Sequence, residues 1–249
     1  MVSSFISQSK PMLMKTVAVD TSGKAGSVAL MDKERVIFES IFDLDKTHSE
    51  TLLSMVDFML NSAGTAIKDI DLISVTTGPG SFTGIRLGAS TVKGLSFAHE
   101  IPVVGVSALR AMAANFPCAS FRIKPVRDAR MGEVYTADFK WSADGMKRLS
   151  DDSAVSPEIM VESINEKTIF VGDGIRKYGH LIREKLGDLA VMADQTCSSI
   201  RASLVAEIGI KRYKEGKTLD LFSFTPNYLR KSQAEINLEK SLLKKKAGR

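Results

Sequence analysis

Short apolar runs alternate with longer amphipathic segments along the chain, and this alternation predicts an α/β fold. The first half reads as strands at residues 16–19, 27–31 and 36–39, a helix at 49–63, a strand at 70–75, a helix at 81–98, a strand at 103–106 and a helix from 107. The second half repeats this order more loosely, with strands at 121–126, 133–139 and 146–149, a helix at 157–164, a strand at 169–171, a helix at 176–185, a strand at 190–192 and a helix at 199–213. The repetition predicts two βββαβα lobes.

The same pattern divides the chain into four parts. We expect a first lobe at 14–112, a second lobe at 113–230 and a hinge within 107–117. Residues 1–13 precede the first strand and are expected to be disordered, with Met12 and Met14 as alternative start residues to Met1. Residues 231–249 form a basic tail.

The stretch at 76–98 is the centre of this organisation. A buried strand leads into the turn Gly78-Pro79-Gly80, and Ser81 is placed to cap the following helix. That helix is apolar or small almost all round, apart from one strip with Arg86 and Lys93. Its three interior glycines, at 84, 88 and 94, each cost about 1 kcal/mol against alanine. They indicate that another backbone approaches closely, and we expect this helix to be packed on two sides.

The helix at 49–63 also has more apolar surface than one sheet can cover. Its apolar residues span roughly 220° of the helical wheel, against a stripe of somewhat over 100° for a surface helix. Two neighbouring helices with spare apolar surface favour docking of a partner or a second copy. The alternative is that the second lobe or the N-terminal segment covers them.

Composition and charge exclude several classes of protein. The formal net charge of +5 equals the charge of residues 230–249, so the body of the chain is neutral. The tail is either a solvated terminus or a contact for phosphate or RNA. Cys118 and Cys197 suggest neither a disulfide framework nor a zinc site and fit a reducing cytoplasm. No secretory signal or membrane-spanning run is found.

Candidate chemistry is sparse. His48, His99 and His180 form no pair at helical ligand spacing, so we expect no metal site. The turn Asp20-Thr21-Ser22 follows the first strand, where duplicated α/β folds of the actin and sugar-kinase sort hold nucleotide phosphates, although these residues are also common in ordinary turns.

Two further segments are singled out by their polar residues. Residues 128–135 predict a hairpin turn with Gly132 at positive φ. Its Asp128, Arg130 and Glu133 either face the cleft between the lobes or pair with one another on the surface. Residues 226–230 are expected to strap the chain back onto the body.

These residues carry a family resemblance. The motifs Val-Ala-Val-Asp-Thr-Ser from Val17, His-Ser-Glu from His48, Thr-Gly-Pro-Gly-Ser-Phe-Thr-Gly-Ile-Arg from Thr77, Asp-Ala-Arg-Met-Gly-Glu-Val-Tyr from Asp128, Gly-Asp-Gly from Gly172 and Pro-Asn-Tyr-Leu-Arg from Pro226 resemble the bacterial TsaB family, also called YeaZ. The resemblance runs from Met14 to about Arg230. It implies an actin-like (ASKHA) fold and a role in making N6-threonylcarbamoyladenosine (t6A) at position 37 of ANN-decoding tRNAs.

In that family this chain is the non-catalytic partner of the paralogue TsaD, which carries the metal site, and the ATPase TsaE completes the assembly. The resemblance therefore implies no catalytic residue, no cofactor and no metal in this chain, with ATP and a metal belonging to the partner subunits, and only indirect contact with tRNA. The helices at 49–63 and 81–98 would hold the two chains together, or pair a homodimer when the chain is alone. The expected contact residues are Leu52, Met55, Val56, Met59, Gly84, Ile85, Arg86, Gly88, Ala89 and Val92.

Three hypotheses remain open on the sequence. The chain is a scaffold that docks on its catalytic paralogue, or an ATP-using enzyme or glycoprotease-like metallopeptidase acting alone, or a tRNA-binding module acting through its tail. The long N-terminal extension and the Lys-rich tail depart from the compact family pattern.

Overall fold

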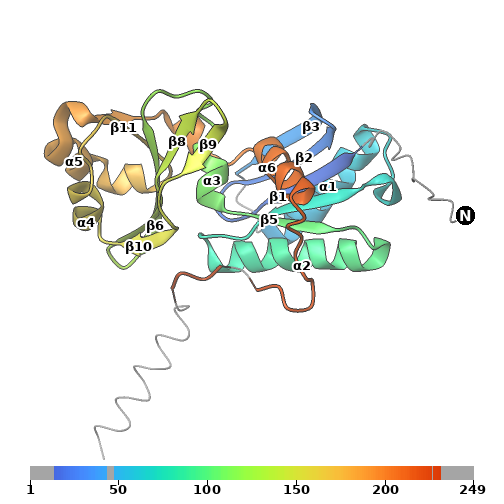
Figure 1. Ribbon diagram of the computed structural model, residues 1–249. Helices are drawn as coiled ribbons and strands as arrows, with labels where there is room; N and C mark the ends of the chain where they lie inside the picture. The colour runs from blue at the N-terminus through green and yellow to red at the C-terminus, as the bar shows by residue number, and fades with distance from the viewer. Residues whose placement is uncertain (1–13, 44–47, 226, 231–249) are drawn as a thin grey trace, which may run out of the picture.

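The computed structural model describes residues 14–43, 48–225 and 227–230. Two β-sheets lie side by side, each with its own helices, and the short helix α3 lies between them (Figure 1). The predictions for residues 1–13, the start residue and the basic tail 231–249 lie outside the described residues. The duplicated α/β, actin-like fold class is confirmed by the two sheets and their order.

The first sheet has the strand order β3-β2-β1-β4-β5. Its strands are β1 (Lys15–Asp20), β2 (Gly26–Asp32), β3 (Arg35–Phe42), β4 (Leu72–Thr76) and β5 (Val103–Val106), with β1, β4 and β5 mutually parallel. Helices α1 (His48–Ser62) and α2 (Phe82–His99) cover one face, and the 3₁₀ turn η1 (Ile67–Asp69) precedes β4. Strand residues alternate between the faces, so Val17, Ile73 and Val75 share a core with α1 and α2.

The second sheet has the path β10-β7-β6-β11-β12, with β8 paired to β6 and β9 paired to β8. Its strands are β6 (Arg122–Arg130), β7 (Glu133–Thr136), β8 (Phe139–Ser142), β9 (Gly145–Arg148), β10 (Ser153–Val155), β11 (Thr168–Val171) and β12 (Ala190–Met192). Helices α4 (Pro157–Glu162) and α5 (Gly174–Leu186) pack on it, and the 3₁₀ turns η2 (Gly187–Leu189) and η3 (Gln195–Ser198) flank β12. The predicted strand at 133–139 is thus two strands, β7 and β8, with a break between them.

The last described helix returns to the first sheet. α6 (Ala202–Lys214) packs against β1, β2 and β4 on the face opposite α2 (Figure 1), although the sequence pattern places its residues in the second lobe. Together with α3 (Ala108–Ala113), it joins Ala18 and Ala29 of the first sheet to Ile123 and Phe139 of the second in one buried cluster. The domain boundaries themselves stay a prediction, but the two lobes share this core.

Candidate functional site

The turn after β1 lies at the junction of the lobes, and its polar groups bind the chain itself. Oδ1 of Asp20 accepts hydrogen bonds from the Ser22 amide (3.1 Å), the Ser22 hydroxyl (2.6 Å) and the Thr76 hydroxyl (2.6 Å). The Thr21 hydroxyl donates to the carbonyl oxygen of Gly84 at 2.7 Å. The predicted phosphate loop Asp20-Thr21-Ser22 is therefore buried and hydrogen-bonded within the chain.

Arg127 of β6 crosses from the second lobe into this turn. Its side chain is 6% exposed, and its guanidinium donates to the Ser22 hydroxyl (2.8 Å), the Ser22 carbonyl (2.8 Å) and the Pro79 carbonyl (3.2 Å). Asp173 stands 3.8 Å from Nε of Arg127. The guanidinium group of Arg127 thus occupies the space beside the turn, and it bonds the groups that would surround a bound phosphate.

The cleft that remains beside Arg127 is small. It has a volume of about 100 Å³ and is lined by residues of both lobes, among them Asp20, Lys24, Arg127 and Asp173. Pockets that bind small molecules and cofactors measure roughly 300–1,000 Å³. A larger open hollow of about 970 Å³ lies between the β2–β3 turn and α6, with acidic and basic side chains mixed along its rim, and it contains none of the predicted site residues.

The predicted hairpin residues lie beside the cleft without lining it. Asp128 accepts from the Arg130 amide (3.0 Å) and pairs with Lys177 (3.4 Å), Glu133 pairs with Arg230 (3.2 Å), and the Arg130 side chain is exposed. Positive φ at Gly132 is confirmed, and Arg130 and Met131 share it. Sequence reasoning missed Arg127, because the strand around it carries other charged residues and nothing local marks this one as buried.

The glycines of α2 are explained in two different ways. A Cβ on Gly84 would stand 2.0 Å from the carbonyl oxygen of Thr21, and a Cβ on Gly88 would stand 2.4 Å from its hydroxyl. The sequence predicts that another segment approaches the helix closely at these two positions. That segment is the turn after β1, which belongs to the chain's own first lobe. Gly94 differs, because it is exposed and a Cβ there would meet nothing within 4 Å.

Most predicted contact residues of α1 and α2 belong to the chain's own core. Their exposed fractions are 8% or less for Leu52, Val56, Met59, Ile85, Ala89 and Val92, and Gly84 and Gly88 are buried too. Met55 is half-buried and Arg86 is exposed. These buried side chains hold α1 and α2 to their own sheet and are not free to contact a partner, and docking through the two helices stays a prediction.

Other apolar side chains of the same helices remain exposed. Leu53 and Phe58 of α1 are 57% and 58% exposed, and Phe97 of α2 is 75% exposed. We call these residues, together with the half-buried Met55, Leu87 and Leu95, the α1–α2 face. Phe58 also contacts Phe38 of β3, with ring centroids 5.9 Å apart.

The segment after α6 runs along the other side of α2, as predicted for residues 226–230. In this strap (residues 219–225 and 227–230) the amide of Leu219 donates to Val103 (2.8 Å) and the amide of Asn227 to Thr77 (2.9 Å). The Tyr228 ring stacks on Phe82 with ring centroids 4.1 Å apart, and the Tyr228 hydroxyl accepts a hydrogen bond from Nε of Arg86 (3.0 Å). The strip of Arg86 and Lys93 therefore holds the strap, since Lys93 donates to the Phe224 carbonyl at 3.0 Å.

The described residues carry neither a candidate metal site nor a candidate membrane span. Within that part of the chain, no group of three or more His, Cys, Asp or Glu side chains is placed to hold an ion. No described helix is long and apolar enough to cross a bilayer. Both cysteines are free thiols.

Comparison with known proteins places these features in a family. Residues 42–238 match the family described as TsaD, tRNA N6-adenosine threonylcarbamoyltransferase. The chain is 32% identical over 225 residues to the tRNA threonylcarbamoyladenosine biosynthesis protein TsaB of Bacillus subtilis and 33% identical over 228 residues to that of Escherichia coli, in each case covering 89% of this chain and 96% of the relative. The solved structure of YeaZ from Pseudomonas aeruginosa superposes with a TM-score of 0.75 at 28% identity, over 87% of this chain and all of that one. This chain belongs to the TsaB (YeaZ) family.

Proposed function

We propose that this chain is the non-catalytic subunit of the cytoplasmic complex that makes t6A in tRNA, and that it docks on a TsaD-type paralogue through the α1–α2 face. The relatives at 32% and 33% identity are named as t6A biosynthesis proteins. TsaE would join through the docked pair, tRNA would be bound mainly by the partner, and the same face could pair two copies when the chain is alone.

The single observation that carries the proposal is the exposure of large apolar side chains on these two helices. Leu53, Phe58 and Phe97 are each more than half exposed on helices whose opposite sides are fully buried. Large apolar side chains gathered on neighbouring exposed helices typically mark an interface once they form one patch. Burying it against a partner helix pair would give the apolar centre that stable interfaces have.

Gly94 adds a second, independent argument. A glycine inside an exposed helix costs about 1 kcal/mol against alanine. No described atom lies close enough to Gly94 to require the absence of a Cβ there. Close approach of a partner backbone would explain why residue 94 is glycine, just as the close approach of Thr21 explains the glycines at 84 and 88.

A non-catalytic role is supported by the way the cleft is filled. Arg127 binds the turn at which a nucleotide phosphate would sit, and about 100 Å³ of space is left beside it. The chain would then act by binding one conformation of the partner better than others, which is the only way a scaffold can shift the partner's equilibrium.

The test is a substitution that fills the α1–α2 face without touching the core. Gly94→Leu places a side chain in open space, so the chain should fold, while docking on the co-expressed paralogue should weaken by roughly 100-fold as the helices are wedged apart. Affinity is measured by titration of the purified paralogue, and t6A formation on an ANN-decoding tRNA is measured with and without the chain.

Two variants serve as controls. Gly94→Ala adds one methyl group and should weaken docking less than Gly94→Leu does, because the smaller side chain displaces the partner backbone less. Lys185→Leu adds the same leucine at an exposed position of α5 in the other lobe, and should leave docking unchanged. Unaltered affinity and t6A formation with Gly94→Leu would reject docking through this face.

A further inference from the structure

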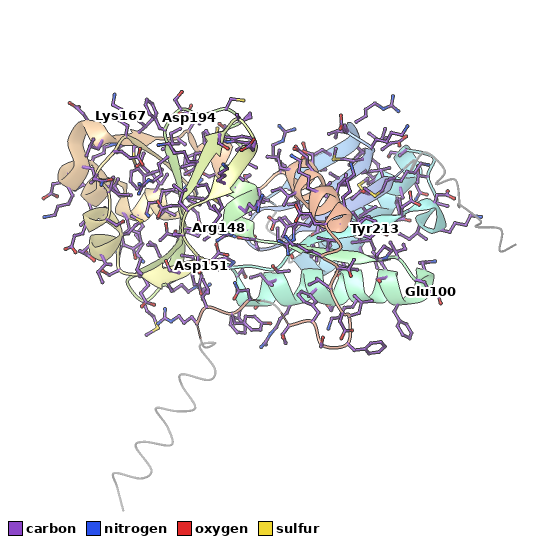
Figure 2. The ribbon with its side chains drawn as sticks, viewed as in Figure 1. Glu100, Arg148, Asp151, Lys167, Asp194 and Tyr213 are labelled. Atoms are coloured by element: carbon purple, nitrogen blue, oxygen red, sulfur yellow. The ribbon has the colours of Figure 1, made fainter. Side chains whose placement is uncertain are left out.

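Three arginines from different elements meet where the lobes join. Arg110 lies on α3, Arg148 ends β9, and Arg212 lies in the last turn of α6. The Ser107 hydroxyl, which caps α3, donates to Asp152 at 2.9 Å, and Arg148 pairs with the other oxygen of the same carboxylate. Arg148 is thereby held beside the start of α3, at the junction visible in Figure 2.

Two of the three arginines are half-buried, and part of each of their guanidinium groups is unpaired among the described residues. Nε of Arg110 and Nε of Arg212 are buried without a hydrogen bond, and neither side chain forms an ion pair with any residue of the part of the chain that the structure describes. By contrast, Arg122 is matched to Glu166 (2.7 Å) and Arg201 to Glu39 (2.6 Å). Leaving buried polar groups unpaired costs about 1–3 kcal/mol each, and more for charged ones.

The local charge increases this cost. Burial lowers the pKa of Arg110, and the neighbouring charges of Arg148 and Arg212 lower it further. Glu215 opposes this effect, but its carboxylate is bound to Lys217 at 2.6 Å. Four cations, Arg110, Arg148, Arg212 and Lys217, therefore face two carboxylates, Asp152 and Glu215, on a body whose formal charge as a whole is zero.

We propose that this arginine cluster binds the phosphodiester backbone of RNA, with Arg110 and Arg212 each donating to phosphate oxygens. A planar guanidinium group can donate two parallel hydrogen bonds to the oxygens of one phosphate, which is a bidentate contact. Because the two donors come from separate elements at the surface, they suit successive phosphates of a strand better than one small enclosed anion. The inference rests on the proposed function, since the RNA it takes is the tRNA that is modified.

The experiment removes the two unpaired charges and keeps the partner interface. The double variant Arg110→Gln/Arg212→Gln is compared with Arg183→Gln/Lys185→Gln, which removes two exposed charges from α5. Binding of an unmodified ANN-decoding tRNA is measured by fluorescence anisotropy over a series of KCl concentrations, on the full chain alone and on its complex with the paralogue. We expect about tenfold weaker binding and a log–log salt slope lower by about 1.4–1.8 for the first variant only. Equal RNA binding by the wild type and the first variant would overturn the inference.

Thermal unfolding separates binding from a structural role. If Arg110 and Arg212 serve RNA binding and not stability, the variant Arg110→Gln/Arg212→Gln should melt no lower than the wild type, because it removes like charges that repel each other. A lower melting temperature with unchanged RNA binding would refute the proposal. So would calorimetric binding of inorganic phosphate that the variant loses while RNA binding stays the same, since that result would mark a small-anion site. If the wild-type chain formed no complex with the paralogue, that result would count against the proposed function. RNA binding by the chain alone would still test the arginine cluster.

Discussion

A missing side chain has opposite consequences at two positions of α2. At Gly84 the absent Cβ lets the carbonyl of Thr21 approach the helix, and that carbonyl belongs to the backbone and cannot rotate away. At Gly94 no atom of the described residues lies within 4 Å of where a Cβ would stand. One residue type in one helix therefore serves the fold at the first position and, by our proposal, a partner at the second.

The two positions make a matched prediction. Gly84→Ala should destabilise the chain by about 2 kcal/mol or more, because the methyl group overlaps a fixed backbone atom. Gly94→Ala should stabilise it by roughly 0.5–1 kcal/mol through helix propensity alone. Urea unfolding followed by circular dichroism measures both, and equal effects of the two substitutions would contradict the assignment.

At the scale of elements, α6 is fixed to the first sheet by a carboxylate from the edge strand. Oε1 of Glu39 on β3 accepts from the amide of Ser203 (2.9 Å) in the first turn of α6, and Oε2 accepts from Arg201 (2.6 Å). An anion at a helix start satisfies amides that have no partner within the helix. Burial by itself would raise the pKa of Glu39, but the hydrogen bonds from Arg201 and Ser203 outweigh it and lower the pKa below 4.5.

This pair gives a prediction with a pH signature. A carboxylate with a lowered pKa in the folded state contributes stability above pH 4.5 and loses it as the pH falls through the lower, folded value. Glu39→Gln should therefore cost about 1 kcal/mol at pH 7, and its deficit relative to the wild type should shrink below about pH 4. Urea titrations at several pH values measure this, with Glu34→Gln on the neighbouring turn as a control. A deficit that stayed constant down to pH 3 would rule out the charge as its cause.

At the scale of the whole molecule, several separate links join the two lobes. The buried cluster around α3 runs from one sheet to the other, Arg127 binds the turn after β1, and the strap ends with Arg230 on the carbonyls of Ala129 and Arg130. Actin-like folds that turn over nucleotide need a cleft between the lobes. Here Arg127 and its neighbours leave a space of only about 100 Å³ in that cleft.

The Arg127 link can be tested directly. Arg127→Met should lower the free energy of unfolding by about 3 kcal/mol, because the Ser22 and Pro79 carbonyls lose their buried donors. Arg130→Met, on an exposed side chain of the same strand, should change it by less than about 0.5 kcal/mol. The comparison is made by urea unfolding at neutral pH, and identical midpoints for the two variants would show that Arg127 does not join the lobes.

The sequence by itself determined the elements and the family. Apolar periodicity placed the helices at 49–63 and 81–98 to within a residue of α1 and α2, and the side chain of Ser81 does cap α2 by accepting from the Gly84 amide at 3.3 Å. Local patterns suffice for these features, because a helix and its cap depend on residues a few positions apart.

Only the tertiary structure decided which side of each helix faces the core. Both helices are apolar nearly all round, so periodicity could not separate Leu52 and Val56, which are buried, from Leu53 and Phe58, which are exposed. The return of α6 to the first sheet, the insertion of Arg127 into the turn after β1 and the meeting of Arg110 with Arg212 each join residues distant in the chain. Such contacts depend on how the elements pack together, and no local pattern in the sequence encodes them.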